Sequence, residues 1–216
     1  MNGKIGFGKT AGHPTRRLWV FPAIFLILLI FIGWDNRQLL PKIRESVIYT
    51  YIQSLGQGRF GTGYGYASTE RVSFAELEPG DIVLGGWPNC AYGRFSHVGL
   101  YIGGNQVLEG YGDYGLTLQD LDHYRNYSEM CLLRVEASRE VKNMAVDYAL
   151  ARQGQMFYPV AFKSDERFWN CSKIIWRAYK NQGIDLDELG DVWIAPESFM
   201  DSRYVKILYE KGMPHS

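Results

Sequence analysis

One β-hairpin places the tightest constraint on how this chain can fold. Segments 97–102 and 106–111 flank Gly103-Gly104-Asn105, and a short Gly-rich turn between two β-forming runs is typical of an antiparallel hairpin. Along the first run every second residue is apolar, so one face is expected to meet the core while the other carries His97. The hairpin therefore predicts an antiparallel sheet with one buried face.

The remaining elements follow in an order that favours an α+β fold. Strands are expected near residues 81–84, 131–135 and 205–208, and helices are expected to begin at Ser138 and Cys171. Parallel βαβ units would alternate strands with helices, whereas here most strands precede the helices. The predicted fold class is α+β, with an antiparallel sheet packed against helices.

The N-terminal segment differs from the rest of the chain. Four basic residues precede an uncharged apolar run over residues 18–34, which is about long enough to span a bilayer. A cleavable secretory signal has a similar pattern, but the residues that follow the run lack the small-x-small motif that signal peptidase needs. We therefore predict an uncleaved transmembrane anchor. The basic residues before it place residues 1–17 in the cytoplasm and the remainder outside.

The predicted organisation has four parts. A cytoplasmic segment (1–17) and the anchor (18–34) are followed by a juxtamembrane helix with a Gly-rich linker (35–67) and one globular domain (68–216). The linker has five glycines between residues 56 and 67, and it lacks the Lys-Ser/Thr of a phosphate-binding loop. We expect it to be a flexible connection.

Composition narrows the possible partners. The formal net charge is zero, so no charge excess favours nucleic acid as a partner. The chain has three cysteines; Cys90 and Cys131 could pair and leave Cys171 free, or all three could be free thiols. One cysteine and one histidine far apart in sequence are too few ligands for a zinc site, and no cofactor is predicted.

Cys171 is the candidate nucleophile. Asn170 is a good N-cap, which places Cys171 in the first turn of a helix, where the partial positive charge favours a thiolate. The alternative is an inert core cysteine, because the following apolar residues recur at helical spacing on the same face.

His97 is the candidate general base. The chain has four histidines, of which His13 and His215 are near the termini and His123 lies in a loop-like region. His97 shares its strand face with Gly99, a small residue that leaves room for a ligand or a partner chain. The alternative for His97 is an ordinary exposed histidine with no catalytic role.

Glu109 is the candidate orienting group for this imidazole. If residues 103–105 form a three-residue loop, Glu109 shares the face of His97 and lies diagonally from it, within reach of its side chain. A loop of two or four residues would move Glu109 to the opposite face. Asp113 and Gln119 are the alternatives for this role.

Several short motifs recur in a fixed order between residues 75 and 200. They are Pro79-Gly80-Asp81-Ile82-Val83, Ser96-His97-Val98-Gly99-Leu100-Tyr101-Ile102, Val107-Leu108-Glu109-Gly110, Asn170-Cys171-Ser172-Lys173-Ile174-Ile175 and Ala195-Pro196-Glu197-Ser198. Together they resemble the circularly permuted papain-like (NlpC/P60-related, YiiX-like) thiol hydrolases, in which the histidine strand precedes the cysteine helix. Each motif is weak alone, and their order makes the resemblance specific.

The resemblance implies roles for the candidate residues. By it, Cys171 is the nucleophile, His97 the general base and Glu109 the third, polar residue, on an antiparallel sheet packed against helices. The group includes amidases and peptidases that act on cell-wall peptides, and relatives that move acyl groups between lipids. One departure is Lys173, since Ser-Glu is more common than Ser-Lys after the cysteine; its charge could favour a thiolate or point to solvent.

Three functions follow from these residues. The leading hypothesis is a membrane-anchored thiol hydrolase that cleaves amide or peptide bonds in cell-envelope peptides. The second is a lipid-directed acyltransferase or esterase that forms a thioester with the same cysteine. The third is a catalytically inactive binding module.

Overall fold

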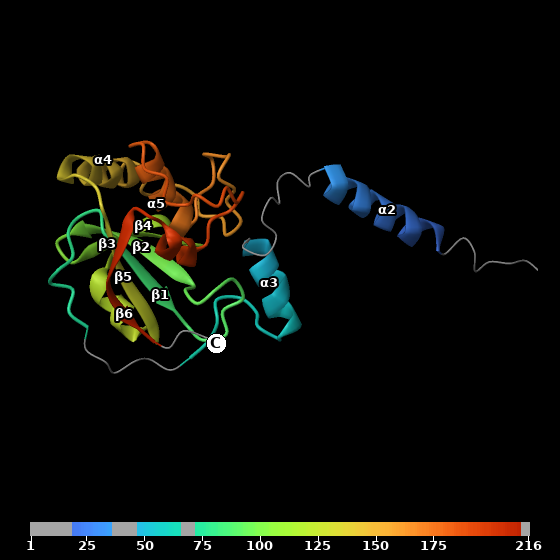
Figure 1. Cartoon of the computed structure of the whole chain (residues 1–216), viewed down its shortest axis with the longest axis horizontal. Helices are drawn as coiled ribbons and strands as arrows, with labels where there is room; N and C mark the ends of the chain where they lie inside the picture. The colour runs from blue at the N-terminus through green and yellow to red at the C-terminus, as the bar shows by residue number, and fades with distance from the viewer. Residues whose placement is uncertain (1–18, 36–46, 66–71, 213–216) are drawn as a thin grey trace, which may run out of the picture. The chain divides into compact units, whose positions relative to one another are not determined.

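The computed structural model describes residues 19–35, 47–65 and 72–212. The chain forms two compact units, residues 1–39 and residues 40–216 (Figure 1). The second unit contains the sheet and every candidate site residue.

The first unit contains α2 (Val20–Asp35), a helix of 16 residues whose side chains are all exposed. No helix in the described part of the chain is long and apolar enough to cross a membrane. The anchor predicted over residues 18–34 is therefore not supported, because α2 is shorter than the roughly 20 residues that a membrane helix needs.

Six strands form one antiparallel sheet in the order β4-β3-β2-β1-β5-β6. Their bounds are β1 (Ile82–Gly86), β2 (His97–Gly103), β3 (Gln106–Tyr111), β4 (Gly115–Asp120), β5 (Glu129–Val135) and β6 (Val205–Lys211). The predicted α+β class with an antiparallel sheet is confirmed. The edge strand β4 was not predicted, because its six residues have only two apolar side chains and it is ordered by pairing with β3.

The β2–β3 hairpin has the predicted register but reaches it through a different turn. Leu100 pairs with Leu108, as a three-residue loop requires. The turn itself consists of Gly104 and Asn105, both with positive φ, and a two-residue turn alone would move Glu109 to the other face. A bulge at the end of β2 supplies one extra residue and restores the register.

Helices α4 (Arg139–Leu150) and α5 (Cys171–Lys180) pack together over one face of the sheet (Figure 1). Both predicted N-caps are present: the side chains of Ser138 and Asn170 each accept a hydrogen bond from the third amide of their helix. The stripe of α5 that faces the sheet is fully buried and comprises Ile174, Ile175 and Ala178. Packing of this stripe fixes where α5 begins, and so fixes Cys171.

The other face of the sheet has a smaller apolar cover. The same unit contains two 3₁₀ helices, η3 (Leu121–Asn126) and η4 (Pro196–Asp201). Leu121 and Tyr124 of η3 are buried in a cluster with side chains of β1, β3 and β5. This cluster holds η3 against the sheet, including β3, the strand that carries Glu109.

Helix α3 (Val47–Gly56) belongs to the same compact unit as the sheet. Its first amide donates to Asp191 Oδ2 at 3.0 Å. Residues 57–65 also form backbone hydrogen bonds with residues 88 and 91. Part of the segment predicted as a flexible linker thus makes defined contacts, while the predicted domain start at residue 68 lies outside the described residues.

Candidate active site

Cys171 is the first residue of α5, immediately after the Asn170 cap, and only 8% of its surface is exposed. Burial alone would raise the pKa of a thiol. Here a hydrogen bond with the His97 imidazole, the charge of that ring and a hydrogen bond from the Val98 backbone outweigh burial and lower the pKa of Cys171. The surroundings of Cys171 therefore favour the thiolate over the neutral thiol.

His97 is the first residue of β2 and lies between Cys171 and Glu109. Its Nε2 atom is 3.4 Å from Glu109 Oε2. Burial alone would lower the pKa of the imidazole, but its interactions with Cys171 and Glu109 raise the pKa to about 10. The structure thus brings together the thiol and imidazole that the sequence placed 74 positions apart.

Glu109 on β3 has no exposed surface and receives several donors. The Tyr111 hydroxyl donates to Oε2 at 2.8 Å, and His123 Nε2 lies 3.4 Å from Oε1. Burial would raise the pKa of this carboxyl, but the neighbouring rings of His123 and His97 lower it to about 2. Glu109 is therefore a carboxylate at any ordinary pH and stabilises imidazolium at His97.

Gly99 has a different role from the one expected. A Cβ atom at this position would lie 2.8 Å from the Tyr124 hydroxyl and 2.9 Å from Glu109 Oε1. The space beside Gly99 is therefore filled by the protein's own side chains and does not accommodate a ligand. Of the alternative orienting residues, Asp113 is exposed in the β3–β4 turn and Gln119 pairs with Val107.

A cleft of about 700 Å³ opens beside Cys171 and His97. Its walls come from β2, β3, the start of α5, α3, and two loops around residues 157–160 and 193–196. Pocket volumes of this size are typical of sites that bind small organic ligands. The arrangement places the Cys171 thiol and the His97 imidazole at the surface of a ligand-sized cleft.

Comparison with known proteins agrees with this geometry. Residues 73–192 match the family of permuted papain-like amidase enzymes, YaeF/YiiX, C92 family. The chain belongs to this family. The resemblance read from the sequence motifs is thereby confirmed at the level of the family and its amidase class, and no curated protein matches the chain significantly.

The crystal structure of metalloprotein yiiX from Escherichia coli O157:H7 has the same fold. It is 18% identical in sequence with a TM-score of 0.53, and the match covers 63% of this chain and 98% of that one. Within the ranges that the structure describes here, no three His, Cys, Asp or Glu side chains are grouped so that they could hold a metal ion. The described residues therefore do not fit a metal centre, and the word metalloprotein applies to the Escherichia coli protein.

Lys173 is the position at which this permuted papain-like amidase departs from the usual motif. Its side chain is fully buried and does not point to solvent. The ammonium donates to the carbonyl of Phe168 at 2.8 Å and to that of Asp165. Lys173 therefore ties the loop before α5 to the helix, and burial lowers the pKa of its ammonium.

His123 is a site residue that the sequence analysis set aside. It lies on η3, where Asp120 caps the first turn, and His123 Nδ1 contacts the Asp120 carbonyl at 2.5 Å. Burial would lower the pKa of His123, but Glu109 raises it. Tyr111 was also missed, although its position two residues after Glu109 on one strand predicts a shared face.

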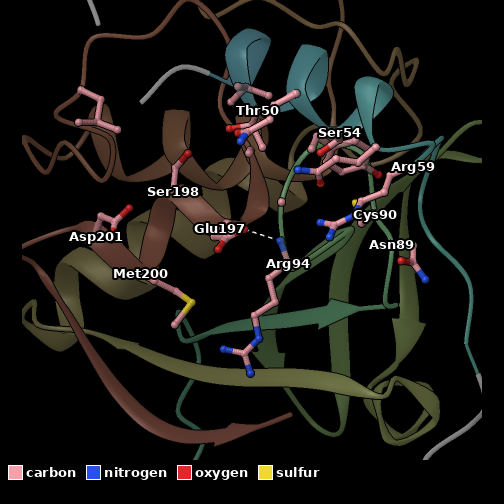
Figure 2. A pocket seen from close by; sticks show the side chains of 17 residues that line it. Thr50, Ser54, Arg59, Asn89, Cys90, Arg94, Glu197, Ser198, Met200 and Asp201 are labelled. Atoms are coloured by element: carbon pink, nitrogen blue, oxygen red, sulfur yellow. Dashed lines mark hydrogen bonds between the residues drawn. The ribbon is translucent and has the colours of Figure 1, made fainter. Parts of the chain in front are cut away.

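A second, polar pocket of about 500 Å³ lies on another side of α3. Figure 2 shows Thr50 and Ser54 of α3 around it, together with Glu197 of η4, which accepts a hydrogen bond from the Arg94 amide at 2.5 Å. The Arg94 guanidinium is itself paired with Glu129 at 2.6 Å. These contacts hold Arg94 in the loop before β2.

Proposed function

We propose that this protein is a cysteine amidase that cleaves amide or peptide bonds by acyl transfer to Cys171. The observation that carries the proposal is one constellation beside the cleft: a thiol with a lowered pKa, an imidazole with a raised pKa, and a buried carboxylate. Opposed shifts of this kind are characteristic of nucleophile–base pairs. The fold could form without any of these three pKa shifts.

The proposed reaction has two acyl-transfer steps. The Cys171 thiolate attacks the amide carbonyl carbon, and the C–N bond breaks as His97 gives its proton to the leaving nitrogen. The amine departs and a thioester remains on Cys171. His97 then takes a proton from water, which attacks the thioester; the C–S bond breaks, a carboxylic acid is released, and the thiol–imidazole pair is restored. Glu109 stabilises the charged ring throughout.

The tetrahedral intermediate needs hydrogen-bond donors for its oxyanion. The backbone amide of Cys171 at the start of α5 is the proposed donor, since amides at a helix N-terminus lack helical partners. A Cβ atom on Gly110, which lines the cleft, would lie 3.2 Å from this nitrogen. Glycine at position 110 therefore keeps the amide open to the substrate.

Cell-envelope peptides are the proposed substrates, and a membrane attachment through residues 18–34 with the enzyme on the extracytoplasmic side is the proposed location. Both rest on the basic and apolar N-terminal sequence and on the substrates of similar enzymes. A fractionation of cells that express the full chain, with protease added from outside, tests the location. Protection of the domain from the added protease would contradict it.

The activity is tested by comparing the wild type with Cys171→Ala on envelope extracts and a panel of synthetic amides. We expect products, measured by mass spectrometry, that require Cys171. Coincident product profiles for the two proteins would remove the amidase proposal.

The rate at which Cys171 is alkylated, measured across a range of pH, distinguishes the enzyme from an inactive binding module. Thiolate formation at Cys171 should have a midpoint below the ordinary thiol value of 9.0, and amide hydrolysis should decline above about pH 10, where His97 loses its proton. Alkylation of Cys171 that begins only near pH 9 would favour the inactive module.

A further inference from the structure

The polar pocket beside α3 is a second cavity of ligand size. Its volume is about 500 Å³, within the range of pockets that bind small molecules. None of the three residues assigned to the amidase reaction lines it. Val47, Tyr92 and Ala195 line both this pocket and the catalytic cleft, so the two cavities share a wall. The polar pocket is therefore adjacent to the cleft, yet it takes no part in the proposed reaction.

Two walls of this pocket come from segments outside the family match. Helix α3 and Arg59 precede residue 73, where the match begins, and η4 follows residue 192, where it ends. Within the match, the lining comes from the loop before β2 and from Leu189. Membership of the amidase family therefore does not by itself imply this pocket.

Ser54 of α3 brings a buried polar group to the pocket. The residue is 6% exposed and lines the cavity, where Figure 2 labels it. Its backbone carbonyl accepts hydrogen bonds from the amides of Gln57 and Arg59, but its hydroxyl has no partner among the residues that the structure describes. A buried hydroxyl without a hydrogen bond lowers stability, and a polar ligand in the pocket would supply the missing partner.

Arg59 supplies a positive charge that the protein leaves uncompensated. Its backbone amide donates to the Ser54 carbonyl at 2.9 Å, and Figure 2 shows its side chain directed into the pocket beside Cys90. In the described part of the chain, its guanidinium forms neither an ion pair nor a hydrogen bond. The other arginine of the pocket, Arg94, is already paired with Glu129. Arg59 is therefore the cation that is free to bind an anionic group of a ligand.

The wall formed by η4 carries the opposite charge. Glu197 and Asp201 both line the pocket, and Glu197 accepts the hydrogen bond from the Arg94 amide. Asp201 is exposed and has no ion-pair partner within the described ranges. A ligand with only negative charge would be repelled by η4, and one with only positive charge would be repelled by Arg59. The pocket therefore fits a ligand that carries both charges.

We propose that this pocket is a binding site for a small zwitterion, namely an amino acid or a short peptide with both termini free. The carboxylate of the ligand pairs with Arg59 and accepts a hydrogen bond from the Ser54 hydroxyl, and its ammonium group pairs with Asp201 and Glu197. The site is distinct from the catalytic cleft, so it does not depend on the proposed amidase reaction.

Calorimetric titration of the full-length Cys171→Ala protein with alanine, dialanine and trialanine tests the site, because without Cys171 the protein cannot consume a peptide by the proposed reaction. We expect saturable binding of at least one of these three ligands. N-acetylation of that ligand removes its positive charge, and C-terminal amidation removes its negative charge; each should lower the affinity about tenfold. Absence of binding at ligand concentrations up to about 10 mM would overturn the proposal.

Substitutions on the two walls, made in the same Cys171→Ala protein, assign each charge of the ligand. Arg59→Gln should lower the affinity for the free ligand about tenfold and abolish the effect of amidation. Asp201→Asn should reduce the effect of acetylation and leave that of amidation in place. Arg203→Gln is the matched control, because the Arg203 side chain is 70% exposed, pairs with Glu188 and lines neither pocket. It should leave every affinity unchanged.

Each outcome decides the proposal. If amidation weakened binding equally with and without Arg59, or if neither wall substitution changed the affinity, the ligand would occupy another site and the proposal would be wrong. The amidase reaction is scored separately, by amide hydrolysis with the wild type. Binding that follows the expected charges while no amide is cleaved supports the pocket and removes the amidase. Cys171-dependent hydrolysis without binding of any of the three ligands keeps the amidase and removes the pocket.

Discussion

The start of α5 and the interior of the sheet each hold a buried thiol, and the two thiols have opposite acidity. Cys131 on β5 is fully buried and Cys171 is 8% exposed, so burial is nearly the same. Burial raises the pKa of Cys131 to about 12, whereas the pKa of Cys171 is lowered. Cys90, in the loop before β2, resembles Cys131, with its pKa raised to about 11 mainly by burial.

The difference lies in the neighbours of each sulfur. Cys171 has an imidazole and a backbone amide within hydrogen-bonding reach, and both favour the thiolate. The carboxylate of Glu210 disfavours a thiolate at Cys131, and that of Glu197 does so at Cys90. The pKa of a buried thiol in this protein therefore depends on the charged and hydrogen-bonding groups beside it. All three cysteines are free thiols, so the disulfide considered between Cys90 and Cys131 is not formed.

The largest effect is expected from removing the imidazole. His97→Ala leaves Cys171 with burial and no cationic partner, so its pKa should rise toward those of the other two thiols. We expect amide hydrolysis to fall about 10⁴-fold or more, and the alkylation midpoint of Cys171 to move above pH 9. Cys131→Ala is the control and should keep full activity. If His97→Ala left the alkylation midpoint unchanged, His97 would not be the cause of the lowered pKa of Cys171.

Glu109→Gln tests whether the carboxylate maintains the charged imidazole. Glu109 is ionised above about pH 2, and its negative charge raises the pKa of His97. The amide removes that charge, so His97 should lose its proton at lower pH and the decline in kcat should begin below pH 10. We expect kcat to fall about 10²- to 10⁴-fold.

A matched control for this variant is Glu129→Gln on β5. Glu129 is also buried and pairs with Arg94, so its substitution should lower the free energy of unfolding as well. It should leave the pH at which kcat declines unchanged. An equal shift of that decline in both variants would mean that Glu109 acts only through stability.

Gly110→Ala tests the amide proposed as oxyanion donor. The added methyl group would stand 2.7 Å from the Phe157 ring and 3.2 Å from the Cys171 nitrogen, so it competes with the substrate carbonyl. We expect kcat to fall about tenfold, with no change in the alkylation midpoint of Cys171. Gly112→Ala is the control, since Gly112 also lines the cleft and its Cβ would contact nothing within 4 Å. Equal losses in both variants would argue against an oxyanion site at residue 171.

The features predicted correctly from the sequence are those that local patterns determine. Alternation and turn residues predicted the hairpin, and the N-caps predicted where α4 and α5 begin. Because the hairpin register is set by nearby residues, the approach of Glu109 to His97 could be predicted without the rest of the fold. The register survived an error in the turn only because a bulge compensates for it.

The features that were missed depend on contacts between distant parts of the chain. His123 reaches Glu109 because β4, which precedes η3, pairs with β3, the strand of Glu109. The sequence of β4 has little of the apolar alternation that predicts a strand. Likewise, no local pattern shows that α3 contacts Asp191 across 144 residues, or that Lys173 caps two carbonyls of the preceding loop. Long-range packing overrides local sequence at these positions.

The smallest expected effect comes from His123, which touches Glu109 and acts through it as a positioning residue. His123→Ala removes one donor from Glu109, which should lower kcat about three- to tenfold. Glu109 then becomes a better acceptor for His97, so the alkaline decline of kcat should stay in place or move to higher pH. This direction is opposite to that expected for Glu109→Gln, and a pH series of kcat measures both.

Two further variants decide whether His123 positions the carboxylate. His123→Gln retains an N–H donor and should restore most of the lost kcat, whereas a purely steric role would leave it as impaired as His123→Ala. Asp122→Asn alters the neighbouring exposed residue, which pairs with Arg125 at 2.7 Å, and should leave the pH profile untouched. If His123→Ala moved the alkaline decline to lower pH, it would be weakening the carboxylate–imidazole pair directly. The lowered pKa of Cys171 would then depend on both His97 and His123. The difference in pKa between Cys171 and Cys131 would come from a wider network than Cys171, His97 and Glu109.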